Sequence, residues 1–264
     1  MAIDSNSYFS NQANVGLGGA TAGTFNKFDL HATPKYALGF KVEQADGSVY
    51  RYVHTGAASN RGVLLAGDLS ETSQVDLDDS VIAPASAVAV SGEALKPGSI
   101  GSRYVEVTIA AITADQFAGA KFVTTDDTGE GYTYDVIGNT ATDNPASGNI
   151  RLELAQPLQV ALDATTDVAI TGNRYSDVET SNTADVDLVG VACATTTSAL
   201  PYCWAQSKGV VGILQDGSIS VGNAITPSSA GNVKVVGAVT DYAIGVCVDT
   251  GDTTGHGTFK INLE

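Results

Sequence analysis

Histidine is the side chain best suited to acid–base chemistry near neutral pH and to metal binding, and the chain contains three histidines. His31, His54 and His256 are far apart in the sequence, and none has another histidine or a cysteine at the spacing of a zinc site. The sequence also lacks the Gly-x-Ser-x-Gly turn of serine hydrolases. A Ser-His-Asp site built by folding stays open, but no motif indicates one. We therefore expect no catalytic residues and no enzymatic activity.

Two acidic stretches, 76–79 and 126–130, carry the carboxylates that calcium loops use. Neither has the spacing of an EF-hand loop, so we predict no bound metal. The Gly-rich run at 14–23 is not followed by the Gly-Lys-Ser/Thr of a phosphate-binding loop. Paired carboxylates for glycoside cleavage would need a substrate cleft, and Tyr132 and Tyr134 are more typical of a core or an interface than of a sugar platform. We expect no cofactor.

The charge of the chain is strongly negative, with 13 Lys and Arg against 29 Asp and Glu and a formal net charge of −16. Phosphate binding needs clustered Lys and Arg, so we expect no nucleic-acid partner and no binding to anionic membranes. Two interpretations of the acidity stay open. It serves solubility alone, or it keeps DNA away from a protein that coats a surface.

The three cysteines, Cys193, Cys203 and Cys247, do not form a disulfide framework, although a Cys193–Cys203 bridge stays open. The first residues have neither a basic region nor an apolar region of a signal peptide. No window approaches the length of a transmembrane helix. These features favour a soluble protein made in a reducing cytoplasm.

Short β-strands joined by tight turns are the elements that this sequence favours. Asp-Gly pairs at 46–47 and 216–217 stand between β-prone runs, which predicts hairpins, because both central residues of a type I′ turn need positive φ. The stretch 62–69 resembles 218–225, which hints at a shared turn or a weak internal duplication. The 29 glycines and the Val, Thr and Ser content favour strands over long helices. We expect an all-β fold of short antiparallel strands in a barrel or sandwich, with two β blocks and very little helix.

The composition along the chain predicts three parts. Residues 1–30 are rich in Asn, Ser and Gly without periodicity, which indicates a flexible N-terminal arm. Residues 31–103 and 180–264 are expected to pack together as one β-barrel-like domain, and residues 104–179 to form the second β block.

The C-terminal part carries a resemblance. Tyr-Cys-Trp-Ala-Gln at 202–206 is followed by a Gly-rich apolar strand, Asp-Gly, Val-Gly-Asn and a final Ile-Gly-Val at 244–246. Gly-Glu-Gly-Tyr-Thr-Tyr at 129–134 and Ile-Gly-Asn-Thr at 137–140 add to it. Over residues 36–264 the chain resembles structural proteins of tailed-phage virions, most closely capsid decoration (cement) proteins.

The resemblance implies a protein of the capsid surface that binds the major capsid protein and stabilises the shell by bridging its subunits, often as a trimer. Many modest contacts would add up over the repeated shell. The arm and the aromatic C-terminal motif would supply the interface. The interface residues expected on this basis are Asn14, Leu17, Phe25, Phe28, Tyr202 and Trp204.

Other functions stay open beside this one. The long acidic chain and the extra β block also suit a tail component or a head-fibre base. A carbohydrate- or cell-surface-binding β module would be favoured by clustered exposed aromatic side chains. A hydrolase would need a deep cleft with converging His, Asp or Glu.

Overall fold

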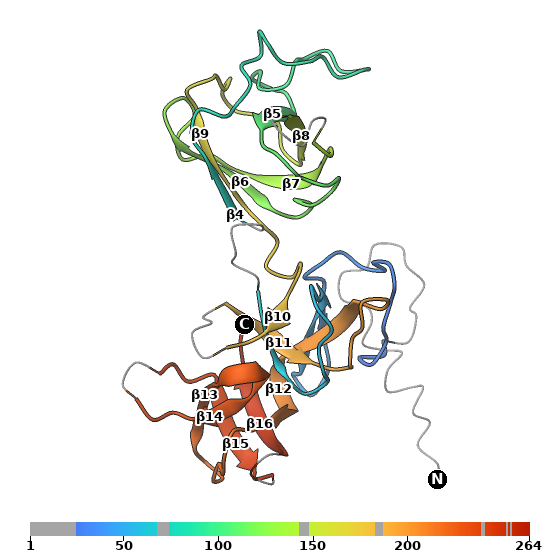
Figure 1. Ribbon diagram of the computed structural model, residues 1–264, viewed down its shortest axis with the longest axis vertical. Helices are drawn as coiled ribbons and strands as arrows, with labels where there is room; N and C mark the ends of the chain where they lie inside the picture. The colour runs from blue at the N-terminus through green and yellow to red at the C-terminus, as the bar shows by residue number, and fades with distance from the viewer. Residues whose placement is uncertain are drawn as a thin grey trace. The chain divides into compact units, whose positions relative to one another are not determined.

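The chain folds almost entirely into β-strands, which confirms the expected all-β class. The computed structural model describes residues 25–67, 74–142, 148–182, 187–238, 241–251, 253 and 255–264. Among these residues there are sixteen strands and one short 3₁₀ helix, η1 (Ser229–Gly231). The strands build two curled antiparallel sheets, one in each of two compact units (Figure 1). None of the helical structure in the described residues is long and apolar enough for a membrane crossing.

The second unit, Leu69–Asn173, is inserted into the first, which comprises Met1–Asp68 and Arg174–Glu264. Its six-stranded sheet has the order β4-β9-β6-β7-β8-β5. The bounds of these strands are β4 (Gln74–Leu77), β5 (Tyr104–Thr108), β6 (Lys121–Asp126), β7 (Thr133–Asn139), β8 (Asn149–Leu154) and β9 (Asp167–Thr171).

The boundary that the sequence suggested between residues 103 and 104 lies inside this second unit. Strand β4 pairs along its whole length with β9, with Val75 opposite Ile170, and so binds the stretch after residue 74 to the second block. Val81 forms a further bridge to Val107 of β5. Pairings between segments so distant in sequence leave no local signal that composition could reveal.

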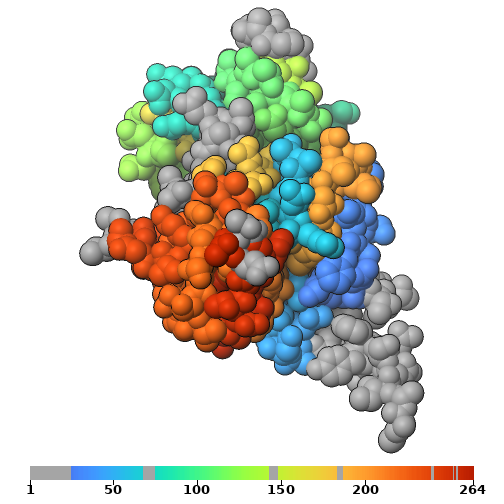
Figure 2. Space-filling model, turned by 60° about the horizontal axis from the view of Figure 1, so that its bottom comes forward, coloured from blue at the N-terminus to red at the C-terminus, as the bar shows by residue number. Residues whose placement is uncertain are grey.

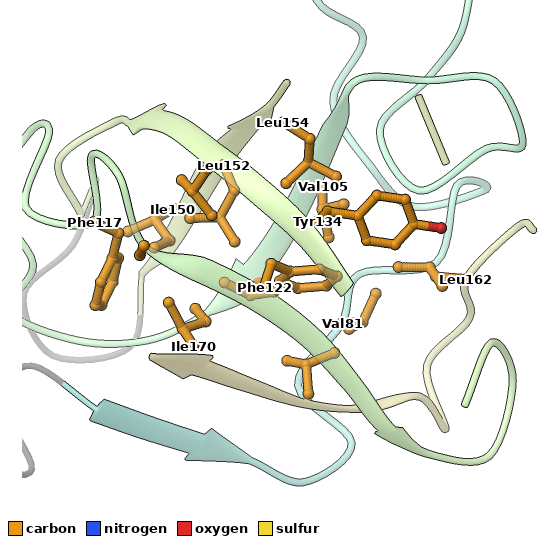
Figure 3. Close-up of a cluster of buried hydrophobic side chains, with 14 of the residues drawn as sticks. Val81, Val105, Phe117, Phe122, Tyr134, Ile150, Leu152, Leu154, Leu162 and Ile170 are labelled. Carbon is orange, nitrogen blue, oxygen red and sulfur yellow. The ribbon is translucent and has the colours of Figure 1, made fainter. Parts of the chain in front are cut away.

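The core of the second unit is a set of large apolar side chains that the two halves of the sheet enclose. Phe122 and Tyr134 lie at its centre, with ring centroids 6.3 Å apart, and Ile150, Leu152 and Ile170 pack around them (Figure 3). The alternating buried and exposed positions of β8 show why the sequence folds in this way, because side chains alternate between the faces of a strand.

One buried ion pair fixes the loop that precedes β5. Glu106 is 4% exposed, and its carboxylate accepts hydrogen bonds from Nε and Nη2 of Arg151 on the neighbouring strand β8. The other carboxylate oxygen accepts a hydrogen bond from the backbone N–H of Val88, and Arg151 donates to the carbonyl of Val88. Because the buried charges are fully paired, the contact stabilises one position of this loop on the sheet.

The first unit contains the other ten strands. Its sheet has the order β10-β3-β11-β12-β16-β15-β13-β14, with β2 pairing β12 and β1 pairing β2 (Figure 1). The bounds are β1 (Lys41–Glu43), β2 (Val49–His54), β3 (Leu64–Ala66), β10 (Glu179–Thr180), β11 (Leu188–Ala192), β12 (Tyr202–Leu214), β13 (Ala224–Pro227), β14 (Val233–Val235), β15 (Gly245–Asp249) and β16 (His256–Asn262).

Apart from β1, this sheet consists of the same five-strand motif twice, with β12 shared between the two copies. Repeat A comprises β2, β3, β10, β11 and the first half of β12, residues 202–206. Repeat B comprises the second half of β12, residues 208–214, with β13, β14, β15 and β16. In repeat A the pairing runs β10-β3-β11-β12-β2, and in repeat B it runs β14-β13-β15-β16-β12. Each strand of one repeat thus has a counterpart in the other, and the 13-residue β12 serves both.

The register of the two repeats agrees residue by residue. Tyr202 pairs with His54 in repeat A, as His256 pairs with Leu214 in repeat B. A parallel bridge joins Thr55 to Val178, and the equivalent bridge joins Gln215 to Val233. The turn glycines also correspond, since the N–H groups of Gly62 and Gly222 donate to the carbonyls of Ala192 and Cys247 at 2.8 and 2.9 Å. The duplication places Gly62 opposite Gly222 in the comparison of the repeats, so the sequence similarity between 62–69 and 218–225 is out of register with it by four residues.

The two repeats meet at a kink in β12. The register shifts between Gln206 and Lys208, and Gly209 adopts φ +109°, in the region that favours glycine. The buried amide of Gln206 donates to the carbonyls of Lys208 and Val210, which satisfies backbone groups that the kink removes from the ladder. A Cβ at Gly209 would lie 2.6 Å from Oγ of Ser48.

The C-terminal side chain returns to the sheet beside this kink. Glu264 accepts hydrogen bonds from Nε and Nη2 of Arg51 at 3.0 and 2.6 Å, and from Oγ of Ser207 at 2.6 Å. Lys41 Nζ lies 3.8 Å from the same carboxylate. The hydrogen bonds from Arg51 are the main cause that lowers the pKa of Glu264 to about 2.

We expect Gly209→Ala to destabilise the protein by about 3 kcal/mol, because the left-handed backbone conformation and the crowding against Ser48 both oppose a side chain. Gly217→Ala is the matched control, since Gly217 has φ +85° but open space around it, and it should lose only about 1 kcal/mol. Chemical denaturation followed by tryptophan fluorescence measures both. Equal losses for the two variants would show that crowding at the kink has no effect.

We expect Glu264→Gln to lower the free energy of unfolding at pH 7 by about 1 to 2 kcal/mol, allowing for screening at this partly exposed pair. The pKa of Glu264 is lower in the folded than in the unfolded protein, so its contribution is present above pH 4.5 and is lost as the pH falls toward 2. Denaturation curves at pH 7, 4 and 2.5 should therefore show a difference in unfolding free energy between wild type and variant that shrinks as the pH is lowered. A difference that does not change with pH would contradict the assignment.

Candidate functional site

An aromatic cluster on repeat A brings together three of the interface residues that the sequence suggested. Trp204 of β12 lies at its centre, 2% exposed. The ring centroid of Phe25 is 4.9 Å from that of Trp204 in an edge-on arrangement, and those of Tyr36 and Tyr52 are 5.2 and 5.1 Å away. Tyr202 stacks on Tyr52 with centroids 6.1 Å apart. These rings stabilise one another, and Trp204 is a core residue of the single chain.

Residues 25–42 provide the outer layer of this cluster. Phe25, Leu38, Phe40 and Val42 are partly buried against Tyr50, Tyr52 and Trp204. Residues 25–30 of the expected N-terminal arm are thus packed on the sheet. Of the other three expected interface residues, Asn14 and Leu17 lie outside the described residues.

Of the expected interface residues that the structure describes, Phe28 is the most accessible. Its side chain is 60% exposed, although it stands next to a chain segment that packs on the sheet. Lys27 Nζ lies 5.3 Å from the ring centroid of Phe28 and 5.7 Å from that of Tyr50. Asp29 accepts a hydrogen bond from the side chain of Asn26 at 2.6 Å. The loop therefore presents an apolar ring between a cation and an anion.

Two of the three histidines flank Tyr202, although they are distant in sequence. His31 forms a β-bridge with Tyr202, and His54 pairs with it from the other side with ring centroids 4.7 Å apart. His31 Nδ1 is hydrogen-bonded to the hydroxyl of Tyr52 at 2.8 Å, and burial is the main cause that lowers the pKa of His31.

Nδ1 of His54 lies 2.9 Å from Oδ1 of Asp177, within hydrogen-bonding distance. The hydrogen bond with His54 is the main cause that lowers the pKa of Asp177. Ser176 donates to the carboxylate of Asp177, whereas the nucleophile of a Ser-His-Asp site contacts the histidine. The pair ties the end of β2 to the segment before β10, which also donates the N–H of Val178 to the carbonyl of His54.

The two acidic stretches converge at one end of the second unit. The N–H of Asp79 donates to the carboxylate of Asp167 at 2.9 Å. The pKa of Asp127 is raised by desolvation and then by the charges of Asp126, Asp167, Asp79 and Asp163. In the part of the chain that the structure describes, no three His, Cys, Asp or Glu side chains are grouped in a way that could hold a metal ion. The convergence is thus a site of like-charge repulsion.

A hollow of about 240 Å³ lies on the second unit between β5, β7 and β8. Asn139 in its wall is already engaged, since its side chain donates to the carbonyls of Thr113 and Thr140 and accepts from the N–H of Phe117. The residues that line it are Tyr104, Asp115, Ile137, Gly138, Asn139, Thr140, Arg151 and Glu153.

The cysteines are free thiols, so the bridge between Cys193 and Cys203 that the sequence left open does not form in this structure. Burial raises the pKa of both thiols to about 12, which keeps them protonated and unreactive at neutral pH.

We expect Asp127→Asn to raise the free energy of unfolding at pH 7, because it removes one charge from the acidic convergence and because Asn tolerates the positive φ of +56° at this position. The gain should shrink in 1 M NaCl, where exposed charges are screened. Glu130→Gln in the same turn is the control for a change of net charge, and thermal unfolding measures both. An equal gain for both variants would point to net charge rather than to this convergence.

The chain was compared with known proteins at three levels. Protein-family models, curated proteins and solved structures yield no match for it. The virion resemblance of the motifs thus stays a prediction from the sequence, and the function has to be argued from the geometry of the described residues.

Proposed function

We propose that this chain is a structural protein of a tailed-phage particle, which binds the outside of the capsid and stabilises it by bridging capsid subunits. The motifs at 129–140 and 202–246 support the phage origin through their resemblance to virion proteins. The net charge of −16 supports a protein that stays away from nucleic acid. In this proposal the chain is not an enzyme, and its partners are the major capsid protein and further copies of itself, in a trimer.

The observation that carries the proposal is that both units have their own core and expose large apolar side chains. A bridging protein needs at least two contact surfaces, and two separately cored units can supply them. In the second unit, Val88, Leu95 and Ile100 are 66%, 43% and 61% exposed within the connection between β4 and β5. In the first unit, Phe28 and Val210 are 60% and 54% exposed.

The connection between β4 and β5 is well suited to hold such a contact. Its backbone is fixed on the sheet through the buried pair of Glu106 with Arg151, which binds both the N–H and the carbonyl of Val88. A loop that is ordered before binding loses less conformational entropy when it docks. Apolar side chains on an ordered loop can therefore add affinity at each capsid subunit.

We expect this chain to be present in purified phage particles at a copy number close to that of the major capsid protein or at a simple fraction of it. Quantitative mass spectrometry of the particles measures this ratio. Particles from which the chain is removed should lose their DNA at lower temperature, because many small contacts repeated over the shell add up. A handful of copies per particle would assign the chain to the tail or a vertex, and its absence from particles would overturn the proposal.

A further inference from the structure

The duplication in the first unit allows the same sheet face to be compared in two settings. In repeat A, neighbouring strands place Tyr50 beside Gln206, and Tyr52 beside Trp204. The equivalent pairs in repeat B are Val210 with Lys260, and Gly212 with Thr258. The register that relates the repeats therefore identifies one face of repeat B as the counterpart of the aromatic face of repeat A.

These two faces differ sharply in burial. Tyr50, Tyr52 and Trp204 are 2%, 0% and 2% exposed, because residues 25–42 cover them. In repeat B, Val210 is 54% exposed, and Gly212 is exposed as well. A sheet face that one repeat buries under its own chain is left uncovered by the described residues in the other.

We call this surface of repeat B the open face. Its first row crosses four strands through direct pairing of Val210, Lys260, Val246 and Ala224. A second row pairs Gly212, Thr258 and Asp249, and the bulge at this point adds Val248, which is 44% exposed. Figure 2 shows repeat B as the orange and red surface, which adjoins the blue surface of the N-terminal segment of the unit.

The side chains of the open face are small where those of repeat A are large. Val210, Gly212 and Thr258 stand at the positions of Tyr50, Tyr52 and Trp204. A layer of bulky apolar side chains on the open face therefore has to be supplied by another segment or molecule. Repeat A shows what the chain uses for this purpose, since Phe25 and Phe40 pack on its aromatic face. An exposed apolar sheet face of this kind is typical of an interaction surface.

Local charge complementarity favours the loop around Phe28 in another copy of the chain as the occupant. Two copies with a net charge of −16 repel each other over most of their surfaces, so contact is favoured where positive and negative side chains can alternate. The open face carries Lys260 in its first row and Asp249 in its second. The loop around Phe28, whose side chain is 60% exposed, has the matching pattern. Lys27 and Asp29 stand on either side of Phe28 in the sequence.

We propose that the open face of repeat B binds a second copy of this chain through the loop around Phe28. The Phe28 ring packs on Val210 and Gly212, while Asp29 faces Lys260 and Lys27 faces Asp249. The contact is head to tail, because a loop of repeat A in one copy meets repeat B of the next, and such contacts close into rings or continue as filaments. The inference needs no capsid, and it names a surface for the self-association that the proposed function only assumes.

The test uses the purified full chain without particles, so that its failure is separate from failure of the proposed function. Sedimentation velocity and light scattering over a concentration series should show a reversible oligomer. Val210→Asp should raise the apparent Kd at least about tenfold, because it buries an unpaired charge in the contact. Ile137→Asp on the second unit is the matched control, since Ile137 is a strand residue that is 50% exposed, and it should leave the mass unchanged.

Three further variants test the loop around Phe28 and its contact with Lys260. Phe28→Ser should weaken the oligomer as Val210→Asp does, and circular dichroism of each variant checks that it is folded. Lys260→Glu should weaken it as well, and combining Lys260→Glu with Asp29→Lys should restore it. A wild-type chain that stays monomeric, or an oligomer insensitive to Val210→Asp, would overturn the inference. An oligomer that is sensitive to Val210→Asp but not to Phe28→Ser would overturn the assignment of Phe28.

Discussion

The first unit depends on one strand, β12, that belongs to both repeats of its sheet. The first half of β12 is hydrogen-bonded on both sides, to β2 and to β11, and its second half starts repeat B by pairing with β16. Such a strand cannot stay regular where its partners change, and the left-handed backbone at Gly209 and the buried amide of Gln206 absorb the change. The same place is reinforced from outside, because Ser207 and Arg51 both bind Glu264. The junction of the repeats therefore depends on the particular residues Gly209 and Gln206.

The fold class could be predicted from the sequence, but the duplication could be seen only in part. Hairpin turns are local, so Asp-Gly pairs and glycine-rich turns predicted short antiparallel strands. The repeats keep the same turns at Gly62 and Gly222 and the same register, whereas their faces have diverged, with Tyr52 in one repeat and Gly212 in the other. A search for repeated hydrophobic patterns compares side chains, so it does not detect a repeated hydrogen-bond register. A duplication conserved mainly in the ladder leaves little sequence similarity, and the resemblance of 62–69 to 218–225 does not follow its register.

Long-range pairing explains why the unit boundary and the candidate site were harder to predict. Strand β4 joins the second unit through β9, nearly a hundred residues later, and no local pattern announces such a partner. Trp204 and Tyr202 stood out in the sequence because of their aromatic motif, yet the fold uses Trp204 as the centre of a core cluster. Among the described interface candidates, Phe28 is the one with most of its side chain exposed. The open face gave no signal at all, because Val210, Gly212 and Thr258 read as an ordinary strand.

The divergence of the two repeats bears on what the molecule does with a duplicated module. A face with large aromatic rings must be covered in the single chain, since exposing Tyr50, Tyr52 and Trp204 would cost hydrophobic free energy, and residues 25–42 supply that cover. A face with Val, Gly and Thr is tolerated in water and yet is flat enough to pack closely. The same ladder can therefore act once as a core and once as a surface, depending on a few side chains. This division leaves the β scaffold the same in both repeats, while repeat B keeps a solvent-exposed face of mostly small side chains.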